Sequence, residues 1–338
     1  MREIIEILRK KIDQKNKVIR EAKNTTLHWA SKNRLLNYRN RELTRLKIQP
    51  YVSPRSICLV DSAVYSEFFG YIDPSILSTP VSILSLSQND FRKSKKHFGK
   101  FRSIYEGYIK TGEQLITKCT HPSLKYSDEK NLTVLAVEAR IATLIGNHQN
   151  IVEYFGLTVW GTKSFIVQSL EPSLTAKDLF MRKFPIKKEV LGSVLQGITS
   201  GMTHMHEKGF LHNNLIPENI ALRTNCEFFT PVILSLSLSC REACSKPFTI
   251  EQQTLFDGFL HLPPCVRQGL EPPSYSSDRY SIGFFIGNIV TLLKLLEAQR
   301  NSQLEYIQQR CFRQDKAVTA KYFFNKVTEC CVQIGYIS

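Results

Sequence analysis

The spacing of apolar and polar residues changes along the chain, and the changes divide it into parts. Past Lys96 the apolar residues gather in short alternating runs typical of strands, interrupted by one helix-like stretch at residues 133–146. After Ala176 the apolar spacing becomes mostly helical. A small strand-rich half with one helix, followed by a larger helical half, predicts an α+β fold with two lobes.

One apolar stretch in the helical half raises the question of a membrane span. It runs from Ser281 to Leu296 and contains Asn288 and Lys294. A bilayer span needs about 20 predominantly apolar residues. The stretch is shorter than that, and it predicts a buried core helix.

The spacing of apolar residues is different in the first 48 residues. They contain no Gly or Pro, and the apolar residues between Ile5 and Ala22 follow a seven-residue cycle that Lys15 interrupts. Residues 1–48 therefore predict an amphipathic helix or a coiled coil, through which the chain would self-associate. A solvated helix packed on its own domain is an equal alternative, because fewer than four clean heptads are present.

Charge is concentrated in the same segment. The net charge is +15, and residues 1–48 hold fourteen Lys or Arg against five Asp or Glu. Basic helices attract phosphate nonspecifically, so binding to nucleic acid or to an anionic membrane is a further alternative. Aromatic residues are sparse there beyond Trp29 and Tyr38, which argues against it.

Residues 49–96 show a weaker pattern. They predict a linker or accessory segment with short strands, or a helix broken by Pro74 and Pro80. The pattern indicates no function for this segment.

Composition sets broad limits. With 338 residues and 42% apolar content, the chain is able to bury a sizeable core. Its nine cysteines are odd in number and form no C-x-x-C pair, and no apolar leader follows Met1. These features predict a reducing, cytoplasmic location.

Five motifs follow one another from the strand-rich half into the helical half. They are Lys118 in "LITK", Glu138 in "VEARIATLIGNHQNIV", Gln168 in "SFIVQSL", the loop "FLHNNLIPENIAL" at residues 210–222, and Asp278 in "SSDRYSIGFF". In order and spacing they resemble the eukaryotic protein kinase domain.

The resemblance implies a two-lobed protein kinase-like fold over residues 97–335, with an N-lobe at about 97–168 and a C-lobe at about 172–335. It implies that Lys118 and Glu138 form the ion pair of the small lobe. It also makes Gln168 the gatekeeper and places Leu170 in the hinge between the lobes.

The residues that the resemblance assigns to catalysis are changed. Phosphoryl transfer requires an aspartate that accepts the substrate proton, and Asn214 occupies that position. An amide accepts a hydrogen bond, but it carries no charge and is a poor proton acceptor. Ile216 replaces the lysine that contacts the transferred phosphate. We therefore expect base catalysis to be lost.

The metal-binding positions are also altered. Ser235 replaces the aspartate of the D-F-G tripeptide, and a hydroxyl is a weak ligand for magnesium. Asn219 is retained as a weak metal ligand. The alternative for Asn219 is a structural role that ties the loop to its neighbours.

The phosphate-binding loop has lost most of its glycines. Aligning Ile104 with the loop valine places His97, Gly99 and Arg102 where three glycines are expected. Glycine allows the backbone to approach phosphate closely, and only Gly99 retains that freedom.

The adenine pocket has Ile116 above and Ala221 below, where the family has a small and a large residue respectively. Either the pocket is repacked at constant volume, or protein fills it, which we favour. We therefore expect no cofactor. ATP held without metal by Lys118 and Glu138 is the alternative, and in the other interpretation that pair only fixes the helix against the sheet.

Together these features predict a catalytically inactive kinase-like domain, a pseudokinase, with an N-terminal helical extension. It would act as a scaffold or allosteric regulator that binds proteins, among them another kinase. The alternatives are an atypical active protein kinase that binds ATP, and a binder of nucleic acid or membrane through residues 1–48.

Overall fold

The structure is a computed structural model, and it describes part of the chain. The described residues are 73–84, 91–97, 103–108, 115–120, 128–160, 163–169, 174–181, 188–225, 228–250, 253, 260–297, 302–313 and 325–329. By its contacts the chain divides into two units, Met1–Tyr51 and Val52–Ser338, and every described residue belongs to the second. The predicted helix at residues 1–48 lies outside the described residues.

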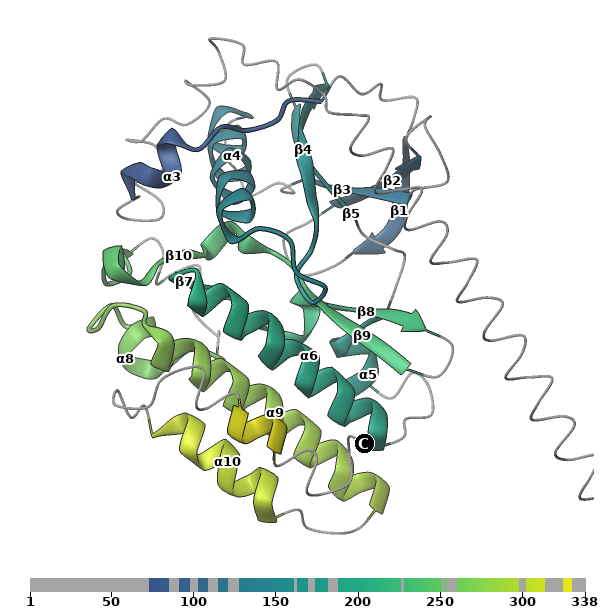
Figure 1. Cartoon of the computed structure of the whole chain (residues 1–338), viewed down its shortest axis with the longest axis vertical. Helices are drawn as coiled ribbons and strands as arrows, with labels where there is room; N and C mark the ends of the chain where they lie inside the picture. The colour runs from purple at the N-terminus through teal and green to yellow at the C-terminus, as the bar shows by residue number, and fades with distance from the viewer. Residues whose placement is uncertain are drawn as a thin grey trace, which may run out of the picture. The chain divides into compact units, whose positions relative to one another are not determined.

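A five-stranded antiparallel sheet forms the first half of the described fold (Figure 1). Its strands are β1 (Phe91–His97), β2 (Ser103–Tyr108), β3 (Leu115–Thr120), β4 (Tyr154–Trp160) and β5 (Lys163–Ser169). Their spatial order is β1-β2-β3-β5-β4, which places β4 at an edge. The strands predicted from the alternating runs are confirmed, and the sheet also includes β1, which begins within the segment predicted as accessory.

Helix α4 (Asp128–Ile145) connects β3 to β4 and packs against β4 and β5. Its apolar side chains, among them Leu135, Val137 and Ile141, are buried. The predicted helix is confirmed and begins earlier than its apolar pattern. The same helix buries Glu138 and Arg140, which is uncommon because charged side chains are seldom fully buried without partners.

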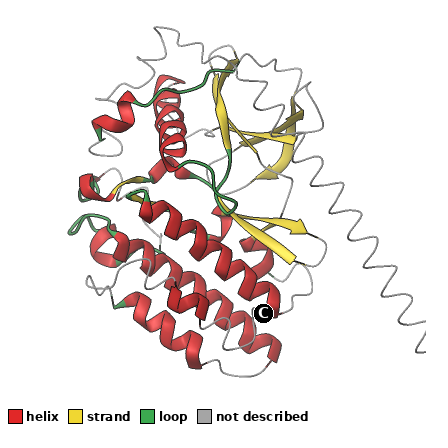
Figure 2. Cartoon of the chain, in the orientation of Figure 1, coloured by secondary structure: helices red, strands yellow, loops and turns green. Residues whose placement is uncertain are grey.

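Helices dominate the second half, as the colouring of Figure 2 shows. They are α5 (Ala176–Phe180), α6 (Lys188–Glu207), α8 (Pro264–Arg267), α9 (Tyr275–Glu297) and α10 (Ser302–Phe312), followed by a helical segment at residues 325–329. Helix α9 contains the predicted core helix at residues 281–296. No helix within the described ranges combines the length and apolar character that a bilayer crossing requires.

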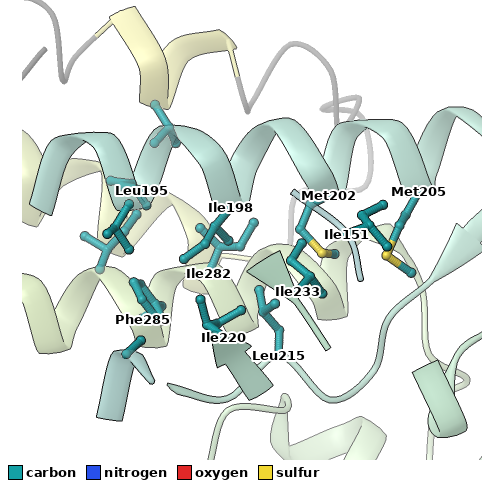
Figure 3. Close-up of a cluster of buried hydrophobic side chains, with 14 of the residues drawn as sticks. Ile151, Leu195, Ile198, Met202, Met205, Leu215, Ile220, Ile233, Ile282 and Phe285 are labelled. Carbon is teal, nitrogen blue, oxygen red and sulfur yellow. The ribbon is translucent and has the colours of Figure 1, made fainter. Parts of the chain in front are cut away.

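The main core lies between α6 and α9 (Figure 3). Ile198 and Met202 of α6 and Phe285 of α9 are buried there. Ile220 and Ile233 join them from two short strands that follow α6. Burial of these side chains from distant segments is what holds the loops between them in place.

Short elements between α6 and α8 carry the predicted catalytic positions. They are β7 (Phe210–Leu211), the 3-10 turn η3 (Pro217–Asn219), β8 (Ile220–Asn225), β9 (Phe228–Ile233), the turn η4 (Leu236–Leu238), β10 (Cys240–Arg241) and the turn η5 (Glu242–Cys244). Strand β8 lies between β9 and the short β6 (Leu174–Thr175), and β10 pairs with β7.

Residues 73–84 precede the sheet and pack on it. Helix α3 (Pro74–Ser78) begins after Asp73, whose carboxylate accepts a hydrogen bond from the Ser75 N–H at 2.9 Å. Proline is favoured at the first helical position because its missing N–H is not needed there. The chain is then extended, and Ile83 forms a parallel bridge with Leu157 of β4.

Two glycines allow α6 to approach the strands closely. A Cβ added at Gly197 would lie 2.4 Å from Pro231 Cγ and 2.7 Å from Asn150 Nδ2. A Cβ added at Gly201 would lie 2.8 Å from Ile233 Cδ1. The packing of α6 on β9 therefore requires residues without a side chain at these positions.

We predict that Gly197→Ala destabilises the domain by about 1–3 kcal/mol, because the added methyl group overpacks the contact with Pro231. The melting temperature should fall by several degrees, roughly 2–4 °C per kcal/mol for a domain of this size. Ser193→Ala on the same helix is the control and should change it little. Equal melting temperatures for the Gly197→Ala variant and wild type would contradict the packing described.

Candidate functional site

The centre of the candidate site is the carboxylate of Asp278, in the first turn of α9. Its side chain is fully buried, with no exposed surface. Oδ2 accepts hydrogen bonds from His206 Nε2 at 2.9 Å and from the His212 N–H at 2.8 Å, and Oδ1 accepts one from the Asn213 N–H at 2.9 Å. Burial alone would raise the pKa of Asp278, but His206 and His212 together hold it below its ordinary value.

His212 connects the loop to the strand that follows it. Its Nε2 lies 3.0 Å from the carbonyl oxygen of Leu234, and its Nδ1 lies 3.2 Å from the Asn214 N–H. These partners fix a neutral tautomer in which Nε2 donates and Nδ1 accepts. Burial lowers the pKa of His212, against the attraction of Asp278.

Asn214 occupies the position that the resemblance assigns to the catalytic base. Its side chain is 7% exposed, and its Oδ1 has no hydrogen-bond partner among the described residues. The Asn219 Nδ2 donates to the Asn214 carbonyl oxygen at 2.9 Å. This hydrogen bond is the contact expected if Asn219 has a structural role that ties the loop together. Its role as a metal ligand stays a prediction.

Ser235 has a left-handed backbone conformation, which is uncommon for a residue other than glycine. Its φ and ψ angles are 67° and 70°, in the left-handed region, and it is buried. A residue other than glycine in a sparsely populated region of this kind costs of order 1–3 kcal/mol. The surrounding contacts therefore maintain the turn although the carboxylate expected at this position is absent.

Glu138 is one of those contacts. It is fully buried on α4, and its Oε1 accepts a hydrogen bond from the Leu236 N–H at 3.0 Å. Lys118 lies in β3, where its backbone pairs with Tyr105 and Val167. The side chain of Lys118 is not among the parts described, so its ion pair with Glu138 stays a prediction.

Two of the predicted nucleotide-binding residues, Ala221 and Gln168, are buried. Ala221 is fully buried and packs in a cluster with Val232 and Leu234. Gln168 is buried on β5, and its Nε2 has no hydrogen-bond partner within the described ranges.

The backbone places the remaining predicted positions only in part. Ile104 and Ile116 lie in β2 and β3, opposite Cys119 and Gly107 respectively. Gly99 and Leu170 lie outside the described residues.

The carboxylates near the loop already have partners. Asp278 and Glu138 accept backbone hydrogen bonds, and Glu218 forms an ion pair with Lys177 of α5 at 2.9 Å. Ile216 precedes the η3 turn and supplies no charge. Within the part of the chain that the structure describes, no three His, Cys, Asp or Glu side chains are grouped as a metal site.

Two histidines of the site were missed by the sequence reasoning. His206 bonds to Asp278 across 72 positions of sequence, which local patterns do not reveal. His261 is buried and hydrogen-bonds to the backbone of Asn213. Burial lowers the pKa of His261 to about 4, although that hydrogen bond raises it.

Comparison with known proteins places this geometry in context. The family model described as "Protein kinase domain" matches residues 97–331. A probable serine/threonine-protein kinase of Dictyostelium discoideum is 24% identical over 66% of this chain and 51% of its own length. Serine/threonine-protein kinase PknL of Mycobacterium tuberculosis is 23% identical over 63% of the chain and 51% of its own length. The chain thus spans about half the length of these two relatives.

A shorter match has higher identity. The MAP kinase kinase MKK1/SSP32 of Saccharomyces cerevisiae is 30% identical over 40% of this chain and 26% of its own length.

We predict that His261 makes the domain sensitive to acid. Below pH 6.5 the unfolded chain binds a proton that the folded chain does not bind until about pH 4. Stability should therefore fall as the pH drops through this window, by ~2 kcal/mol at pH 5. Denaturant unfolding at pH 7 and pH 5 measures the loss.

The matched variant is His261→Gln, whose amide also donates a hydrogen bond but does not titrate. The difference in unfolding free energy between wild type and this variant should shift by ~2 kcal/mol between the two pH values. A difference that is the same at both would show that another group causes the acid sensitivity.

Proposed function

The chain belongs to the protein kinase family, and on that premise we propose that it is a pseudokinase that works by binding proteins. In this proposal the domain acts as a scaffold or an allosteric regulator in signalling. It transfers no phosphate.

One observation carries the proposal. The loop and the turn that present catalytic groups in this family are both built, yet they present Asn214 and Ser235. A neutral amide does not draw a proton from a hydroxyl, and a serine does not anchor a divalent cation with the strength of a carboxylate. The missing groups are those that phosphoryl transfer requires.

The nearby carboxylates support the same conclusion. Asp278 and Glu138 accept hydrogen bonds from backbone N–H groups, and turning either carboxylate away toward a metal would leave those groups unpaired. An unpaired buried N–H costs about 1–3 kcal/mol. Glu218 forms an ion pair with Lys177.

An atypical active protein kinase is the second candidate. Glu138 of α4 and Asn219 of the loop are retained, and relatives of the chain carry the names of kinases. In that case ATP would bind, with Lys118 gripping a phosphate. We favour the interpretation in which no nucleotide binds, because Ala221 is already fully buried in an apolar cluster. This burial fits an adenine pocket that protein side chains fill.

The partners and location are part of the proposal. We propose a protein partner, with another kinase as one class, and self-association through residues 1–48. Binding of that basic segment to nucleic acid or membrane is the least favoured alternative. A cytoplasmic location is supported by Cys240, Cys244 and Cys311, which form no disulfide with another described cysteine.

The first test is a thermal-shift titration with ATP, with and without magnesium. For wild type we predict a rise in melting temperature of less than about 1 °C, because a ligand that does not bind the folded state does not stabilise it. Lys118→Ala is the matched variant. A magnesium-dependent rise that Lys118→Ala abolishes would favour the ATP-binding candidate.

The second test measures phosphate transfer directly. We predict that radiolabelled ATP gives no transfer to the chain itself or to Ser, Thr and Tyr peptides, because Asn214 stands where a carboxylate is needed to accept the hydroxyl proton. Asn214→Ala should give the same background. Transfer above background that is lost in Asn214→Ala would mean that the domain is an enzyme.

A further inference from the structure

Residues 73–84, which we call the strap, bury apolar side chains on α4 and on the sheet. Ile76 is buried in the core cluster that includes Val137 of α4. Val81 is buried in the second cluster, which includes Leu135 of the same helix. Burial of this kind is the main source of stability for a short segment with few hydrogen bonds of its own.

The backbone of the strap also extends the sheet at its edge. The Leu157 N–H donates to the Ser82 carbonyl oxygen at 2.8 Å, and the Leu84 N–H donates to the Leu157 carbonyl oxygen at 2.7 Å. This close approach requires Gly156, since a Cβ there would lie 2.7 Å from the Ser82 carbonyl oxygen and 2.8 Å from Leu84 Cγ.

A buried arginine ties the strap to α4. Arg140 is 1% exposed, and its Nε donates to the carbonyl oxygen of Thr79 at 2.9 Å. Burial lowers the pKa of Arg140. The carbonyl of the strap is thus part of what compensates this guanidinium for the loss of water.

The start of the strap reaches the segment that follows Ser235. Arg241 Nε lies 2.7 Å from Asp73 Oδ2 and donates to Ser75 Oγ at 3.2 Å. The guanidinium carbon also lies 4.6 Å from the centre of the Phe210 ring. Arg241 therefore joins the strap to the strand pair formed by β10 and β7.

These contacts connect the strap, α4 and residues 236–241 in a ring. The strap holds α4, α4 carries Glu138, and Glu138 holds the Leu236 N–H. From Leu236 the chain runs to Arg241, which returns to the strap through Asp73.

We propose that the strap is a built-in clamp that couples the position of α4 to that of residues 236–244. A partner that displaces the strap then changes the positions of α4 and residues 236–244 together. This inference goes beyond the proposed function, because the coupling is a property of the fold whether or not phosphate is transferred.

The test is amide hydrogen exchange in the full chain, with Gly156→Val as the variant. The added side chain expels the strap from the edge of the sheet. Exchange should become faster by about tenfold or more in residues 73–84, in α4 and in residues 236–244. Peptides from β5 should keep their wild-type rates.

Gly197→Ala is the matched control, because it crowds the packing of α6 on β9 and does not touch the strap. It should not change exchange selectively in α4 and residues 236–244. Faster exchange confined to the strap in Gly156→Val would show a passive cover and would overturn the proposal.

A milder pair of variants keeps the test decisive if Gly156→Val fails to fold. Asp73→Asn removes the ion pair with Arg241, and exchange of residues 236–244 should rise by up to about fivefold. Arg241→Gln should add little further in that background if the two residues act as one contact. Unchanged exchange of residues 236–244 in Asp73→Asn would mean that the ion pair between Asp73 and Arg241 does not couple the strap to these residues, and would overturn the proposal.

Discussion

The hydrogen bonds accepted by the buried Asp278 carboxylate are the interaction on which the rest of the site depends. They occupy the backbone N–H groups of His212 and Asn213, which would otherwise be buried and unpaired at a cost of about 1–3 kcal/mol each. With the loop fixed, His212 reaches Leu234 and so sets the start of the turn at Ser235. Glu138 then holds the other side of that turn.

The polar residues of the site fall into two groups: those that bind backbone groups of the protein, and those at positions that face a substrate or a metal in this family. Those that hold backbone groups, such as Asp278 and Glu138, are retained, since losing one of them would leave buried groups unsatisfied. The positions whose groups would act on a substrate or a metal hold Asn214 and Ser235 instead. Folding needs the first kind of residue whether or not any reaction takes place, so the loop and the turn keep their conformations with Asn214 and Ser235 in place.

The sequence predicted the order of strands and helices well, because long periodic stretches such as α4 and α9 carry a strong local signal. The strap was predicted only as a weak accessory segment, and the reason is physical. Its helix has five residues, and its extended part is held by Leu157 of another strand, so little in its own periodicity reports the partner. The same holds for His261, whose neighbour Asn213 is 48 positions away in the sequence.

By itself the sequence determined which chemical groups stand at the catalytic positions, because the loss of charge at Asn214 and Ser235 is a matter of residue identity alone. It also determined the family resemblance, through the order of its motifs. Only the tertiary structure decided that Glu138 holds Leu236, that His206 shares Asp278 with the loop, and that Arg241 meets Asp73. These contacts join residues far apart in the chain, and their geometry is set by how helices and strands pack, which local periodicity does not encode.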